Sequence, residues 1–65
     1  MIKKLVGKPV LIDEDRWQIV GETDDGRLIE VTLLRDVMKA HNFQEPNLEA
    51  ANAVPAVGVR VIRGD

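Results

Sequence analysis

Two runs of alternating apolar and polar residues enclose a turn in the stretch DRWQIVGETDDGRLIEV, which covers residues 15–31. Alternation with a period of two is typical of a strand with one buried face, and Asp25-Gly26 between two such runs is a strong signal for a β-hairpin. The stretch therefore predicts two antiparallel strands whose register has to be decided.

A loop of three residues, 24–26, gives the hairpin one apolar face. This register pairs Trp17 with Leu33, Ile19 with Val31 and Gly21 with Ile29, and on the other face it pairs Gln18 with Thr32 and Val20 with Glu30. A two-residue loop would move every side chain to the opposite face and set apolar residues against polar ones. We therefore expect Trp17 to point into the core and Gly26 to adopt the left-handed conformation that glycine tolerates.

Further strands are expected at both ends of the chain. PVLI, residues 9–12, is typical of a short strand, and residues 2–6 form either a strand or an arm. VGVRVIR, which begins at residue 57, alternates without a break and predicts a final strand. We expect this strand to place its three alternating valines in the core: Val57, Val59 and Val61.

The middle of the chain predicts a helix and a less regular segment. Leu34, Val37, Met38 and His41 recur at spacings of three and four, which indicates one face of a helix that ends near Asn42. His41 is expected to cap the last turn, where a partly positive imidazole interacts favourably with the helix dipole. Residues 44–56 form either a short helix that starts at Pro46 and runs through Ala53, or a loop that orders against a partner.

These elements predict the α+β class for one small domain, residues 1–65. The expected architecture is a small antiparallel sheet, or an SH3-like barrel, of 3–4 strands with one short helix after the central hairpin. A β-grasp arrangement is the alternative.

Composition argues against the common kinds of catalytic and metal site. The chain has no cysteine, no serine and one histidine, so disulfides, thiolate or multi-histidine metal sites and the usual nucleophile–base pairs cannot form. We identify no catalytic, metal-binding or cofactor-binding residue and expect a non-enzymatic protein without a cofactor. A chain of this length buries only about 60% of its unfolded surface. Contact with another subunit is the remaining way to stabilise so small a core.

The charge of the chain is that of an ordinary soluble surface, with a formal net charge of −2 and both signs mixed. Phosphate backbones are bound by basic stripes, so nucleic-acid binding is possible but not favoured. The N-terminal apolar run is broken by Gly7, Lys8 and Pro9 short of the length of a signal peptide, and no stretch is long enough to span a membrane. We expect a cytoplasmic protein.

One face of the predicted sheet keeps apolar residues that a single helix on the other face cannot cover. The candidate interface residues are Val20, Leu28, Leu34 and Ile62, interleaved with Arg16 and Arg60. A contiguous apolar patch usually marks an interface. We therefore expect a protein partner, self-association as a dimer, and a role as an accessory subunit, adaptor or regulator. A nucleic-acid-binding small β-barrel is the alternative.

The hairpin stretch DRWQIVGETDDGRLIEV also resembles the central hairpin of BrnT-type toxins, which are ribonucleases of the RelE-like superfamily. An acidic residue followed by Arg16 and Trp17 leads into the first strand, and DGR forms the turn. The resemblance covers about a quarter of the chain, and MIKKLVGKPVLI has no counterpart to the helical N-terminal part of that family. It implies a third function, a RelE/BrnT-like ribonuclease toxin.

Overall fold

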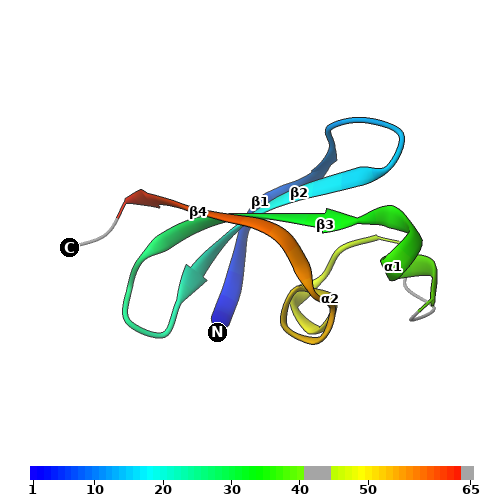
Figure 1. Cartoon of the computed structure of the whole chain (residues 1–65). Coiled ribbons are helices and arrows are strands. Elements are labelled where there is room, and N and C mark those ends of the chain that lie inside the picture. The colour runs from blue at the N-terminus through cyan, green and yellow to red at the C-terminus, as the bar shows by residue number, and fades with distance from the viewer. Residues whose placement is uncertain (41–44, 64–65) are drawn as a thin grey trace.

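A four-stranded antiparallel sheet carries two short helices in the computed structural model, which describes residues 1–40 and 45–63 (Figure 1). In chain order the elements are β1 (Ile2–Leu11), β2 (Arg16–Thr23), β3 (Leu28–Leu34), α1 (Arg35–Ala40), α2 (Leu48–Ala53) and β4 (Ala56–Arg63). The strands are hydrogen-bonded in the order β1-β2-β3-β4, so β1 and β4 are the two edges of an open sheet. The expected α+β class and small antiparallel sheet are confirmed.

The central hairpin has the expected register. Trp17 lies opposite Leu33, Ile19 opposite Val31, and Gly21 opposite Ile29. The turn is closed by the Thr23 N–H, which donates to the Arg27 carbonyl at 2.9 Å, and by the Gly26 N–H, which donates to the Thr23 carbonyl at 3.0 Å. Gly26 has φ 86°, in the left-handed region, so the three-residue loop is confirmed.

The N-terminal strand is longer than expected. The two expected segments, 2–6 and 9–12, fall in one strand, β1, which ends one residue earlier, at Leu11, and has an irregularity between Val6 and Val10. Gly7 has φ 77° at this point, where a side chain would strain the backbone. The irregularity lets one strand follow the strongly twisted sheet along most of its length.

The segment between β3 and β4 folds as two helices. Leu34 is the last residue of β3, and α1 begins at the next residue and buries Met38. α2 begins after Asn47, whose side-chain oxygen accepts the Ala50 N–H at 2.8 Å as an N-cap. The helical alternative is therefore confirmed, with Asn47 rather than Pro46 defining the start. The expected roles of His41 and Asn42 lie outside the described residues.

Both helices pack on one side of the sheet, which we call the core face. The buried apolar residues are Ile2, Ile19, Val31, Leu33, Met38, Ala50 and Val54. Asn52 attaches α2 to β1, because its side-chain oxygen accepts the Ile2 N–H at 3.1 Å and its amide donates to the Ile2 carbonyl at 3.0 Å. Trp17 is half-buried and packs against this cluster, on the side that the sequence predicts.

The burial expected for the final strand is wrong. The side chains of Val57, Val59 and Val61 are 52%, 62% and 55% exposed. Val59 and Val61 lie opposite Val31 and Ile29, so they do share the core face. However, α2 packs against β1 and α1 against β3, and the β4 side chains stay uncovered. Alternation identifies the face of a strand, but it does not show whether another element covers it.

Candidate interaction surfaces

The sheet face opposite the two helices is called the open face. Residues directly opposite each other in an antiparallel pair point to the same side, so the strand register assigns the members of this face. They are Lys4, Val6 and Val10 of β1, Arg16, Gln18, Val20 and Glu22 of β2, Leu28, Glu30, Thr32 and Leu34 of β3, and Gly58, Arg60 and Arg63 of β4. Apolar and charged side chains therefore alternate across the whole sheet.

Five of the six candidate interface residues share the open face: Arg16, Val20, Leu28, Leu34 and Arg60. The three apolar members of this set are half-buried. Ile62 lies at the register shift where β4 has one residue more than β3, and its side chain is 48% exposed. The structure thus brings five candidates together and leaves Ile62 at the edge of the sheet.

Two apolar residues of the open face were missed by the sequence reasoning. Val6 and Val10 are 41% and 55% exposed, and Val6 lies directly opposite Val20. Their strand was expected as two separate segments, so their faces were not assigned. The spacing of Lys4 and Val6 places both residues on the same side of one strand, but the sequence alone does not show which face of the sheet that side joins.

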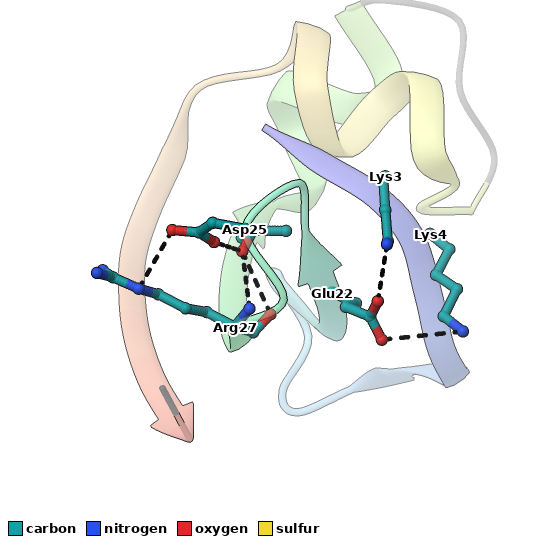
Figure 2. A network of polar contacts seen from close by, with 6 residues as sticks. Lys3, Lys4, Glu22, Asp25 and Arg27 are labelled. Atoms are coloured by element: carbon teal, nitrogen blue, oxygen red, sulfur yellow. Dashed lines mark hydrogen bonds and ion pairs between the residues drawn. The ribbon is translucent and has the colours of Figure 1, made fainter. Parts of the chain in front are cut away.

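The Glu22 carboxylate forms ion pairs with two lysines at one corner of the open face (Figure 2). This carboxylate lies 3.1 Å from the Lys3 ammonium and 3.8 Å from the Lys4 ammonium. The register of β1 shifts between Ile2 and Lys4, and this irregularity lets two successive side chains reach the same carboxylate. The hydrogen bond from Lys3 and the charge of Lys4 hold the pKa of Glu22 below its usual value.

The two candidate arginines are paired with carboxylates. The Arg60 guanidinium donates to Glu30 Oε2 at 3.0 Å across the β3–β4 pair. Arg16 Nε donates to Asp13 Oδ2 at 2.7 Å, and this hydrogen bond lowers the pKa of Asp13. Arg16 and Arg60 are therefore each bound to a carboxylate and are not free members of the kind of basic stripe that binds a phosphate backbone.

The tip of the central hairpin borders a hollow of about 360 Å³. Thr23 Oγ1 donates to Asp25 Oδ1 and accepts the Arg27 N–H at 3.1 Å, while Arg27 Nε lies 3.3 Å from Asp25 Oδ2 (Figure 2). The hydroxyl of Thr23 lowers the pKa of Asp25. The hollow is lined by Met1, Thr23, Asp24, Asp25, Arg27, Ile29 and Val61. The hollow thus lies between the N-terminal residue that precedes β1 and the outer strand β4.

The described parts of the chain, 1–40 and 45–63, contain no group of three or more His, Cys, Asp or Glu residues that could hold a metal ion. No helix within those ranges is both long and apolar enough to cross a membrane. No protein-family model matches the chain, and comparison with curated proteins and with solved structures finds no match to it. The surfaces described above therefore supply the argument about function.

Proposed function

We propose that this protein is a small non-enzymatic interaction module, an accessory subunit, adaptor or regulator that acts by contact with another protein. The supporting observation is the open face. Val6, Val10 and Val20 form an apolar strip across β1 and β2, and Val6 and Val10 are exposed. An apolar patch with charged side chains around it has the composition of a protein–protein interface, in which a dry centre is surrounded by a polar rim.

The charges around this strip favour a protein over a nucleic acid. Glu22 pairs with both Lys3 and Lys4, and Glu30 pairs with Arg60, so each of these three basic side chains already has a carboxylate partner. A phosphate backbone would have to displace these carboxylates before it could be bound. A protein surface with mixed charges can instead exchange ion-pair partners at the rim while apolar groups meet at the centre.

The experiment compares proteins retained from a native lysate by immobilised wild type and by the double variant Val6→Lys/Val10→Lys. Both valines are exposed, so the substitutions leave the core intact. Leu48→Lys is the matched control, because Leu48 is an exposed apolar residue on α2, away from the open face. We expect at least one protein to be retained by wild type and by Leu48→Lys and to be lost from the double variant.

Retention that is the same for wild type and the double variant would contradict the proposal. Nucleic acid in the eluate, with retention that falls steeply as salt is raised, would favour the nucleic-acid alternative instead. Circular dichroism of each variant before immobilisation shows that the comparison is made between folded proteins.

A further inference from the structure

The outer strand β4 is an apolar sheet edge. All eight of its residues are exposed, including Val57, Val59, Val61 and Ile62. One side of β4 is hydrogen-bonded to β3, and β4 ends the sheet on the other side. An exposed, apolar edge strand is a template for another strand, because its outward N–H and C=O groups have no neighbour in the sheet.

The usual protection of an edge strand is weak in the centre of β4. Charged side chains and irregularities commonly keep edges from pairing. The two register shifts of β4 lie outside Gly58–Val61, where the pairing with β3 is regular. The one charged residue within that stretch is Arg60, and its guanidinium is bound to Glu30. The centre of β4 is therefore a regular, neutralised and largely apolar strand.

We propose that β4 pairs with β4 of a second copy of this chain, antiparallel and about a twofold axis at Val59. The two sheets then continue into each other, and Val59 lies opposite Val59 of the second copy. The proposal concerns the sheet edge and not the open face, so it is independent of the proposed function. It places the expected dimer contact along the outer strand, which carries Arg60 and Ile62 of the six candidate interface residues, and not on the open face.

The choice of the axis follows from the side chains that each register sets against each other. With the axis at Val59, Arg60 faces Gly58, which leaves room for the guanidinium. Val61 then faces Val57, the extra residue at the register shift between Ala56 and Gly58. With the axis at Arg60, two arginines would lie directly opposite each other, which destabilises a sheet. With the axis at Gly58, Val61 would face Pro55, which has no N–H to donate. The register centred on Val59 is the one that sets all three valines against valines.

The hollow beside β4 supports the same register. Val61 and Ile29 form part of its wall. In the proposed pairing, Val57 of the second copy lies next to Val61 and therefore beside the apolar part of this wall, whose other side is the polar hairpin tip. Strand addition at an edge gains affinity from main-chain hydrogen bonds and specificity from nearby pockets that take alternate side chains. The hollow is placed to serve as such a pocket.

Sedimentation equilibrium of the full chain from micromolar to millimolar concentration tests the assembly. We expect wild type to approach twice the monomer mass as concentration rises. Val59→Lys places two like charges at the axis and should weaken the dimer by about tenfold or more. Leu48→Lys is the matched control, since it introduces the same charge at an exposed apolar residue of α2 that belongs neither to β4 nor to the open face, and it should dimerise like wild type.

Single cysteine variants test the register, because the chain has no cysteine of its own. Opposite residues of an antiparallel pair have Cα atoms about 4.5–5.5 Å apart, within the range of a disulfide. Val59→Cys should therefore form a covalent dimer under mild oxidation, while Val61→Cys, which faces Val57 instead of itself, should not. Equal cross-linking of the two variants would overturn the register. A wild type that stays monomeric at every concentration would overturn the dimer and leave β4 as an edge for a strand of a different protein.

Discussion

Gly21 and Ile2 are in closer contact than any residue with a side chain at position 21 would allow. A Cβ atom on Gly21 would lie 2.6 Å from Ile2 Cγ2 and 2.8 Å from Ile2 Cδ1. Ile2 is buried, and both its backbone groups are bonded to Asn52 of α2. The glycine thus makes the space in which the start of β1 and α2 meet the sheet.

We expect Gly21→Ala to lower the free energy of unfolding by about 1–3 kcal/mol, because the added methyl group overpacks a core that cannot shift freely. Urea denaturation followed by circular dichroism measures the change. The double variant Gly21→Ala/Ile2→Ala is the control, since it removes the three nearest atoms, Cγ2, Cδ1 and Cγ1 of Ile2. In the Ile2→Ala background, Gly21→Ala should lower the free energy of unfolding by much less. If the free-energy changes of the two substitutions simply add, the contact between Gly21 and Ile2 is not the cause of the loss.

Gly26→Ala tests a different property of glycine. No atom lies within 4 Å of the position that its Cβ would take, so the cost comes from the φ of 86° alone. We expect a loss of about 1 kcal/mol or more, since the left-handed conformation is unfavourable for alanine. Asp24→Ala in the same loop changes no such conformation and should have little effect. A neutral Gly26→Ala in thermal and urea denaturation would contradict the loop geometry.

The central hairpin could be predicted in detail because two local signals agree. The turn requires a glycine at position 26, and one register alone gives an apolar face with Trp17, Ile19 and Val31. Turn residues and strand alternation depend on residues that are close in the sequence, so both can be recognised from the sequence alone. The cap at Asn47 is also local. Whether residues 44–56 form a helix or a loop depends in addition on the packing of Ala50 in the core, which the sequence alone does not show.

The burial of β4 and the face of Val6 could not be predicted in the same way. The valines of β4 have the pattern of a buried strand, but their burial depends on where α1 and α2 pack, which is decided by contacts such as Asn52 with Ile2, fifty residues apart. The face of Val6 depends on the pairing of β1 across an irregularity at Gly7. Surfaces are set by such long-range contacts, so the sequence assigned the shared face of the β2 and β3 residues but not that of the β1 residues.

Trp17 is expected to report on the unfolding of the whole domain. It is half-buried and packs against the core beside Leu33, its cross-strand partner. Its fluorescence should be blue-shifted in the folded protein and move to the red on unfolding, and Trp17→Ala should cost about 3 kcal/mol. Trp17→Phe is the matched control, because it keeps most of the packing area. A native emission spectrum like that of free tryptophan would contradict the packing.

Glu22 should make the stability of the protein depend on pH in the acid range. The hydrogen bond from Lys3, reinforced by the charge of Lys4, lowers the pKa of Glu22 in the folded state below the ordinary value of 4.5. A carboxyl group with a lowered folded pKa stabilises the fold fully above its unfolded pKa, and this contribution is lost as the pH falls from there through the folded pKa. We therefore expect the free energy of unfolding to fall as the pH is lowered below about 4.5.

Comparing how steeply the free energy of unfolding falls with pH in wild type and in variants identifies the group responsible for the fall. Urea denaturation at a series of pH values should show a shallower decline for Glu22→Gln than for wild type, because glutamine has no proton to bind. Part of the decline should remain at lower pH, since Asp13 and Asp25 also have pKa values below their ordinary 3.8 in the folded state. Lys3→Met removes the donor and keeps the carboxylate, so it should flatten the curve in the same range. An unchanged slope in Glu22→Gln would show that the lysine cluster does not stabilise the corner where β1 meets β2.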